Sequence, residues 1–345
     1  MTVTEGKAPD SAQALETYFR NIAVLNQAFS EPGQAFRDSR APAHPGAETQ
    51  DRAILWLGCN VLRTPHLLQV AASIVRMLNP ELSVLGGRSH CCGSPMSDPG
   101  DRERALGLAV DGFRKENAAT MITWCPACHT NLRNGSDASS WGFEELHITE
   151  YLAERLQRLR LQPRISARVL LHGHTGAPDR DKDMRYCRKI LETIPGITVI
   201  GESSDVELGL HCVPTLLVPK IGAETFERKL QGILSQVREA GADMLVTIYH
   251  SCYRELEKRL DLPAPASDGP AESGLAPLIE NYITLLAKAL DLPLPANLYR
   301  EFAHAEPERL VQITSQVQSR VPDPRKLESA VAAEFPSRSA AQSEP

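Results

Sequence analysis

Several classes of protein are excluded by what this 345-residue sequence has little of. No stretch approaches the roughly 18 consecutive apolar residues that a membrane-spanning helix requires. The first thirty residues lack a basic segment followed by a continuous apolar run, so a secretory leader is not expected. A formal net charge of -6 gives no reason to expect a nucleic-acid partner. We therefore expect a soluble, cytoplasmic protein.

Two sequence motifs of redox proteins are also absent. The chain has no Cys-x2-Cys-x2-Cys run of the ferredoxin kind and no Gly-x-Gly-x-x-Gly segment. It is therefore not expected to hold a ferredoxin-type cluster or a dinucleotide. Structural disulfides are not expected either, because cytoplasmic thiol pools keep cysteines reduced. The eight cysteines therefore favour metal ligation or catalysis.

Five of these cysteines lie at three separate points of a 70-residue stretch. They are Cys59, the adjacent Cys91 and Cys92, and the pair Cys125 and Cys128. Five thiols are more than a disulfide or a single tetrahedral metal needs, so the arrangement favours an iron–sulfur site. The less favoured alternatives are a zinc site with a spare thiol and a buried group of inert cysteines. The pattern therefore points to redox chemistry.

An internal repeat organises the chain. Residues 118–132 match residues 241–256, and a period of about 120 places Cys92 opposite Cys212 and Cys128 opposite Cys252. In each half, short apolar strands alternate with helical stretches, which indicates parallel βαβ units. The expected strands are 53–57, 82–85 and 121–124, then 168–171, 197–200 and 244–249. We predict an α/β fold of two tandem, duplicated, small Rossmann-like parallel-sheet domains that face a shared cleft.

The flanking segments complete the predicted domain organisation. Residues 1–50 are expected to hold an amphipathic helix and a linker. The first repeat is assigned to 51–165 and the second to 166–292. A C-terminal extension occupies 293–345, and its end is expected to be disordered because it is rich in Ala, Ser, Glu and Pro.

The predicted topology explains the cysteine spacing. Cysteines 59, 91, 92 and 125 each follow a strand, so all five sulfurs can converge at the carboxyl edge of one sheet, where open α/β sheets bind ligands. Cys128 enters the first turn of the next helix, where the helix dipole favours a thiolate. Gly58 and Gly93 are expected to leave backbone room beside an inorganic core.

The Cys91-Cys92-Gly93 signature and the Cys125-Pro126-Ala127-Cys128-His129 segment resemble the CCG-domain family, whose best-known member is the B subunit of heterodisulfide reductase. The resemblance covers about residues 51–292. It implies a noncubane 4Fe-4S cluster ligated by Cys59, Cys91, Cys92, Cys125 and Cys128, which binds and cleaves a disulfide and exchanges electrons with partner subunits. Related modules occur in iron–sulfur subunits of lactate, glycolate and glycerol-3-phosphate oxidising complexes.

The second half departs from the family pattern. Thr175 stands where the first cysteine is expected, and only Cys212 and Cys252 of five thiols remain. These two cysteines, with His172, His174, His211 and His250 near the same edge, would bind zinc or a modified cluster. Alternatively the second site is vacant, and His211 and His250 exchange protons with a sulfur substrate as catalytic residues. An exclusively structural role for all of them remains open.

The resemblance leads to one function with two alternatives. The leading hypothesis is an oxidoreductase subunit of a heterodisulfide-reductase-like complex, with the sulfur-oxidising type preferred, that makes or breaks a sulfur–sulfur bond on a disulfide, a persulfide or a lipoyl carrier. Its implied partners are a ferredoxin-like iron–sulfur subunit and a flavin-containing subunit. The alternatives are an electron-relay subunit of a lactate or glycolate oxidase and a noncatalytic zinc scaffold.

Five further residues are candidates for a role near the site. Cys187 lies on a predicted helix away from any strand end, and we expect it to pack in the core. His66 and His129 follow ligand loops and either bond a sulfur or lie on a helix surface. Arg63 and Arg88 either stabilise an anionic cluster or are ordinary surface arginines.

Overall fold

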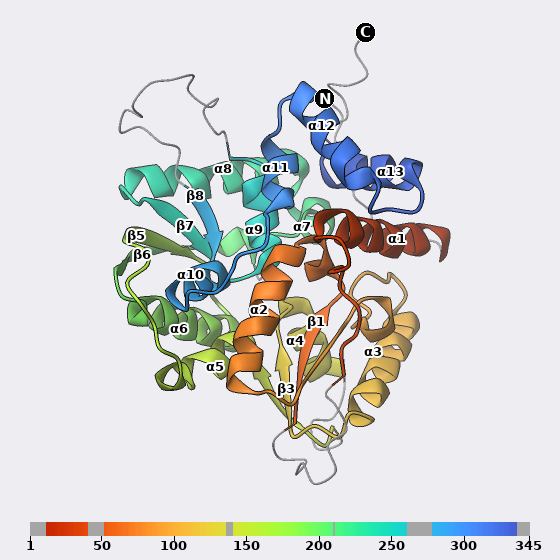
Figure 1. Cartoon of the computed structure of the whole chain (residues 1–345), viewed down its shortest axis with the longest axis horizontal. Helices are drawn as coiled ribbons and strands as arrows, with labels where there is room; N and C mark the ends of the chain where they lie inside the picture. Colours follow the sequence, from red (N-terminus) through yellow and green to blue (C-terminus); the bar gives the residue numbers. More distant parts are fainter. Residues whose placement is uncertain (1–11, 41–51, 136–140, 210, 261–277, 337–345) are drawn as a thin grey trace. The chain divides into compact units, whose positions relative to one another are not determined.

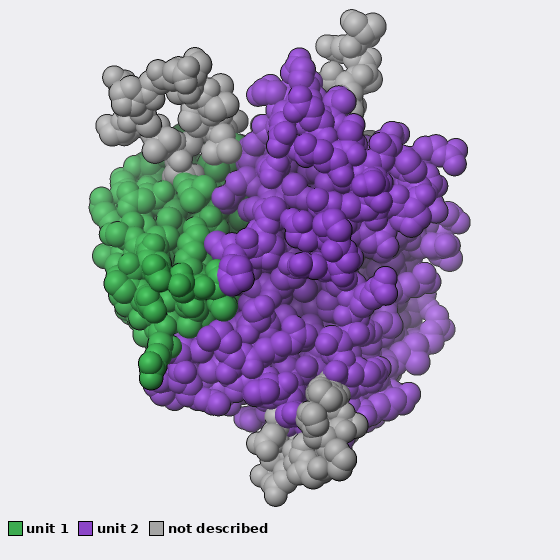
Figure 2. Space-filling view, viewed as in Figure 1, with its two compact units in different colours: residues 1–6, 160–292 green, residues 7–159, 293–345 purple. Residues whose placement is uncertain are grey.

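The computed structural model describes residues 12–40, 52–135, 141–209, 211–260 and 278–336, and Figure 1 shows their arrangement along the chain. The chain divides into two compact units, coloured separately in Figure 2. One unit runs from Arg160 to Leu292, and the other combines Lys7–Leu159 with Pro293–Pro345. The predicted disorder at the end of the tail concerns 337–345, which lies outside the described residues. No helix in the described part of the chain has the length and apolar character needed to cross a bilayer.

The first sheet contains four parallel strands in the order β2-β1-β3-β4. Every residue of β1 and β2 is buried, as expected for a sheet that helices cover on both faces. The strands are β1 (Ala53–Gly58), β2 (Leu82–Gly86), β3 (Thr120–Thr123) and β4 (Glu144–His147). The helices are α2 (Pro65–Leu78), α3 (Pro99–Arg114), α4 (Pro126–Gly135) and α5 (Ile148–Ala153).

The second sheet repeats this topology in the order β6-β5-β7-β8, again with all strands parallel. Its strands are β5 (Ala167–His172), β6 (Ile197–Ser203), β7 (Met244–Thr247) and β8 (Leu278–Asn281). Its helices are α6 (Pro178–Thr193), α7 (Pro214–Ile221), α8 (Ala223–Glu239), α9 (His250–Glu257) and α10 (Tyr282–Ala289). The predicted α/β class with two duplicated parallel sheets is confirmed. A cleft shared between the domains stays a prediction.

Two strands were not expected from the sequence. The amphipathic patterns from Ile148 and from Leu275 predict one helix in each half. Each of these helices is preceded by a four-residue strand, β4 or β8, that runs directly into it. The helix of the second half begins only at Tyr282. The prediction of a single helix was wrong there because the apolar residues of strand and helix form one continuous series, without a Gly or Pro between them.

The terminal segments of the chain pack on one another in the unit that contains the first sheet. α1 (Ala12–Phe29) contacts α13 (Pro324–Glu334), α12 (Pro307–Gln318) and α2. Phe29 lies against Phe302 of α11 (Leu298–His304), with 4.9 Å between ring centroids. The N-terminal amphipathic helix therefore buries its apolar face within its own unit.

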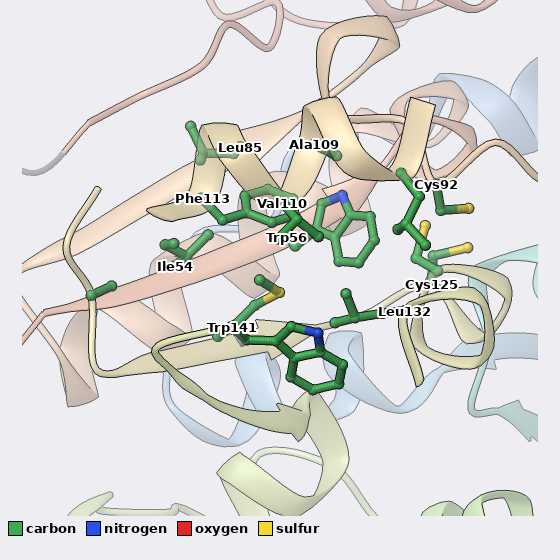
Figure 3. Close-up of a cluster of buried hydrophobic side chains, with 14 residues drawn as sticks. Ile54, Trp56, Leu85, Cys92, Ala109, Val110, Phe113, Cys125, Leu132 and Trp141 are labelled. Carbon is green, nitrogen blue, oxygen red and sulfur yellow. The ribbon is translucent and has the colours of Figure 1, made fainter. Parts of the chain in front are cut away.

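A hydrophobic core lies between the first sheet and α3 and extends to the cysteine loops. Trp56 packs against Phe113 with 4.9 Å between ring centroids, and its indole N–H donates to the carbonyl of His90 at 2.8 Å. Figure 3 shows the side chains of Cys92 and Cys125 at one end of this core. The loop that carries Cys91 and Cys92 is thus held in place by a buried hydrogen bond from the sheet.

Candidate functional site

Each of the five first-half cysteines lies in the segment that follows a strand or in the first turn of the next helix. Cys59 follows β1, Cys91 and Cys92 follow the short 3-10 helix Arg88–His90 after β2, and Cys125 comes two residues after β3. Cys128 is the third residue of α4. All five side chains are buried, with exposed fractions from 1% for Cys128 to 8% for Cys125. The prediction that they converge at one sheet edge is confirmed by their contacts.

The sulfurs form a continuous series of contacts. Cys91 interacts with both Cys59 and Cys92, Cys92 interacts with Cys128, and Cys128 interacts with Cys125. Hydrogen bonds to Cys59 and Cys92, together with burial, raise the pKa of the Cys91 thiol. The bond from Cys128 holds the pKa of Cys92 well below its usual value. Packed in this way, the five groups can all be thiolates only if positive charge lies among them.

A glycine provides space beside these sulfurs. Gly58 has a φ of +69°, and a Cβ placed on it would lie 2.7 Å from Cys128 Sγ and 3.2 Å from Cys125 Cβ. Such a contact is closer than real Cβ atoms approach, so a side chain at residue 58 would displace a sulfur. Gly93 has another reason to be glycine, because its Cβ would meet the backbone of Arg102 at 2.6 Å. Glycine at residue 58 therefore leaves room for the side chains of Cys125 and Cys128, and glycine at residue 93 leaves room for the backbone of Arg102. The expected room for an inorganic core beside the two glycines stays a prediction.

Two polar side chains that the sequence did not single out contact the sulfurs. The Asn131 amide donates to the carbonyl of Cys92 at 3.2 Å and to Cys92 Sγ at 3.6 Å. The Tyr18 hydroxyl of α1 lies 3.9 Å from Cys59 Sγ. Asn131 lies three residues after Cys128 on α4, so helical spacing offered a signal for it. Tyr18 carried no such signal, because its position depends on the packing of α1.

These donors suit an iron–sulfur cluster. Cysteine thiolates are the usual ligands of iron–sulfur clusters, and hydrogen bonds to sulfur adjust their potential. The extended series of five sulfurs exceeds the four donors of a tetrahedral ion. The room beside Gly58 and the positive charge that the thiolates require are also consistent with a cluster. The residues that would hold it are Cys59, Cys91, Cys92, Cys125 and Cys128.

The other candidates of the first half have structural partners. Arg63 forms a buried ion pair with Glu334 of α13, and its guanidinium lies 5.3 Å from the ring centroid of Tyr18. Arg88 lies over Phe19 of α1, at 5.7 Å. The two histidines are buried rather than on a helix surface: His129 Nδ1 lies 3.4 Å from a carboxylate oxygen of Glu145, and burial lowers the pKa of His66 to about 3.

A second group of ligand-type side chains lies at the carboxyl edge of the second sheet. The ligand atoms of His172, His174, Cys212 and Cys252 all lie within 4.8 Å of one another. His174 Nε2 is 3.2 Å from Cys252 Sγ and 3.5 Å from Cys212 Sγ, and His172 Nε2 is 3.4 Å from Cys212 Sγ. Burial raises the pKa of Cys212. Although burial opposes it, hydrogen bonding and nearby His174 hold the pKa of Cys252 well below its usual value.

His211 and His250 are not part of this group of four. They lie beside Cys212 and Cys252 in the sequence, but the two imidazoles that reach the sulfurs are those of His172 and His174. Burial, with the nearby His174, lowers the pKa of His211 to about 4. His211 is therefore uncharged at neutral pH, and the catalytic role of both residues stays a prediction. Cys187 is fully buried in α6, as expected for a packing residue.

Part of this chain matches a known family model, and most of it is similar to known proteins. Residues 53–133 match the family model of the CCG cysteine-rich domain. The B subunit of a fumarate reductase (CoM/CoB) from Methanothermobacter marburgensis is 25% identical over 275 residues, which is 76% of this chain and 51% of that protein. The D subunit of a dihydromethanophenazine:CoB–CoM heterodisulfide reductase from Methanosarcina barkeri is 23% identical over 274 residues, 74% of this chain and 64% of that protein.

The chain thus spans between about half and two thirds of the length of these curated relatives. Among solved structures, an aspartate racemase homologue of Pyrococcus horikoshii OT3 is 12% identical and covers 70% of this chain and 98% of its own, with a TM-score of 0.30. A TM-score this low supports no inference about function. The part of the chain that matches the CCG cysteine-rich domain model, residues 53–133, contains all five cysteines of the first site, and about three quarters of the chain is similar to one of the subunits of a heterodisulfide reductase.

Proposed function

We propose that this chain is the iron–sulfur subunit of a heterodisulfide-reductase-like complex, in which a noncubane 4Fe-4S cluster makes or breaks a sulfur–sulfur bond. The observation that carries the proposal is the contact series of five buried cysteines at one sheet edge. Three separate loops supply these sulfurs, and Gly58 leaves room beside them. Core packing alone would not gather inert cysteines at three strand ends.

The relatives support sulfur chemistry in particular. Both curated names include the CoM and CoB pair, and one of them names a heterodisulfide reductase. Reduction of a disulfide to two thiols consumes two electrons and two protons, and the reverse reaction releases them. A bound cluster would supply iron to contact a substrate sulfur, but a single cluster normally transfers one electron. The proposal therefore includes partner subunits: a ferredoxin-like iron–sulfur subunit and a flavin-containing subunit.

The substrate and the proton carriers belong to the same proposal. The substrate is a disulfide, a persulfide or the sulfur of a lipoyl carrier, in the cytoplasm, where thiols stay reduced. If the second site holds no metal, His211 and His250 are the proposed proton-exchanging groups. Because burial lowers the pKa of His211 to about 4, its ring is uncharged at neutral pH and would have to be protonated before it could donate a proton to a thiolate. Turnover unchanged in His211→Ala would remove that residue from the mechanism.

Metal analysis of the full chain, purified without oxygen, tests the cluster. We expect about four irons with matching sulfide per chain, and we expect Cys91→Ser to lose most of both. Cys187→Ser is the matched control, since Cys187 is equally buried but lies in α6. Iron that is unchanged in Cys91→Ser would refute the assignment of the ligands.

A second measurement separates bond cleavage from simple electron relay. If a substrate sulfur contacts the cluster, adding a disulfide or a persulfide to the oxidised or reduced chain changes its electron paramagnetic resonance spectrum. A relay subunit of a hydroxy-acid oxidase would give the same iron content without that change. An unaltered spectrum at saturating disulfide would therefore favour the relay and exclude sulfur–sulfur chemistry at this cluster.

A further inference from the structure

We infer that His172, His174, Cys212 and Cys252 form a closed, four-coordinate zinc site at the carboxyl edge of the second sheet. Four donors of the types that zinc prefers lie within 4.8 Å of one another. In a tetrahedral zinc site the nitrogen and sulfur ligands are about 3.5 Å apart, given Zn–S and Zn–N bonds of about 2.3 and 2.05 Å. The three nitrogen–sulfur separations are 3.2, 3.4 and 3.5 Å.

The two imidazoles are already in the tautomer that a metal needs. His172 Nδ1 lies 3.0 Å from the carbonyl oxygen of Ser203, and His174 Nδ1 lies 2.8 Å from that of Gly209. Carbonyl oxygens only accept hydrogen bonds, so each Nδ1 carries the proton and each Nε2 presents its lone pair. Such a bond on the distal nitrogen is the usual way in which a protein orients a metal-binding histidine.

Secondary structure fixes all four donors. His172 is the last residue of β5, and His174 lies two residues beyond it on the same side of the extended chain. Cys252 lies in the first turn of α9, and Cys212 precedes α7. The glycine between the histidines is required for packing, because a Cβ on Gly173 would lie 2.2 Å from Met184 Sδ.

The burial of the four ligand side chains favours a zinc ion with a structural role and no open coordination position. The exposed fractions of the four side chains are 0% or 1%, so solvent does not reach the donors. With four protein ligands the tetrahedron is complete, and no position is left for water or a substrate. The bound ion would join the ends of two strand loops and the start of α9, and it would stabilise the second domain without taking part in electron transfer.

The same geometry disfavours a two-iron cluster. In a Rieske centre two histidines bind one iron and two cysteines bind the other, so the nitrogen and sulfur donors are separated across the core. Here each histidine lies within 3.4 Å of a cysteine sulfur, and His174 contacts both sulfurs. Donors interleaved in this way surround a single ion.

The test uses the full chain purified without oxygen, in which zinc and iron are measured separately. We expect about one zinc per chain, and at least a fivefold loss of zinc in Cys212→Ser and in Cys252→Ser, with iron and sulfide unchanged. Cys187→Ser keeps both metals, because this buried cysteine of the same unit is not among the four donors. Stoichiometric zinc in both ligand variants, or iron in place of zinc in the unaltered chain, would overturn the assignment.

Zinc-edge X-ray absorption of the unaltered chain gives a readout that does not depend on how well the variants fold. Two sulfurs near 2.3 Å and two nitrogens near 2.0–2.1 Å are expected, and a shell of sulfur alone contradicts the site. The result is independent of the proposed function. Cys91→Ser should lose iron and keep zinc, so failure of the cluster assignment and failure of the zinc assignment give different metal patterns.

Discussion

Replacing Gly58 with alanine tests whether the first site is built around a space at the end of β1. The residue has a φ of +69°, which costs a residue with a Cβ roughly 1–2 kcal/mol. The added methyl would also lie 2.7 Å from Cys128 Sγ, where ordinary contacts begin near 3.4 Å. Overpacking of this kind costs about 1–3 kcal/mol more, and here the group that must move is a cluster ligand.

Gly87 provides a matched control for the backbone term. Its φ is +76°, but a Cβ there meets only Leu62 Cδ2, at an ordinary 3.7 Å. With a ψ of -158°, Gly87 lies in a backbone region that other residues rarely adopt, so Gly87→Ala should lose about 1–3 kcal/mol of unfolding free energy and keep its iron. Gly58→Ala should lose about 2–5 kcal/mol, the sum of both terms, and most of its iron and sulfide.

The assay is iron and sulfide per chain after purification without oxygen, followed by urea unfolding of the same samples. Both residues have a positive φ, and only Gly58→Ala adds a contact with a sulfur, so iron loss in that variant alone points to the sulfur contact. If Gly58→Ala retains the iron content and the spectrum of the unaltered chain, no ligand sulfur depends on that space. The assignment of Cys128 to the cluster would then fail.

Three further predictions concern the surroundings of the first site. Asn131→Leu removes the hydrogen bond to Cys92 Sγ and should lower the cluster's reduction potential at constant iron content; an unchanged potential in a redox titration would contradict this. Arg63→Met removes the ion pair of the buried Glu334 carboxylate, which keeps the hydrogen bond from the Tyr299 hydroxyl, and should cost about 3–5 kcal/mol in urea unfolding, whereas a double variant with Glu334→Gln should recover part of the loss; no recovery would refute the ion pair. Because the pKa of His66 is about 3 in the folded chain, below its ordinary value of 6.5, its contribution to stability is present above pH 6.5 and is lost as the pH falls. The unaltered chain should therefore lose about 1 kcal/mol more than His66→Gln between pH 6.5 and 5.5, and equal losses would contradict the buried neutral ring.

The sequence was sufficient to predict the framework that positions the first site. Three strands in each half were predicted near their observed bounds because short apolar runs ended at loops. The fourth strands were missed, although His147 and Asn281 both accept a hydrogen bond as the N-cap of the following helix and therefore marked where it begins. The N-cap residues, rather than the apolar periodicity, marked where each helix begins.

In the second site, the sequence indicated which residues lie near one another but did not indicate which histidines contact the sulfurs. The sequence placed four histidines near Cys212 and Cys252 and favoured His211 and His250 for chemistry. On a helix, residues i and i+2 do not share a face, so His250 and Cys252 point apart on α9. His172 and His174 are two residues apart at the end of β5. In an extended strand, residues with this spacing lie on the same side of the chain. Periodicity at the end of β5 was the signal that would have distinguished them.

The strand registers of the two sheets show which residues of the two proposed metal sites occupy equivalent positions. Thr123 pairs with Trp56 and Thr247 pairs with His172, so Gly58 and His174 occupy equivalent positions two residues further on. In the first domain a Cβ on Gly58 would collide with Cys128 Sγ; in the second, the ring of His174 reaches the sulfur of the corresponding Cys252 at 3.2 Å. The second domain thus has an imidazole at the position where the glycine of the first domain lets the side chains of Cys125 and Cys128 lie against the backbone. This difference agrees with the two proposals, a cluster ligated by cysteines alone in the first domain and a zinc ion with His174 among its ligands in the second. If the second domain holds zinc, which is redox-inactive, the second electron of the proposed sulfur–sulfur reaction would come from a partner subunit.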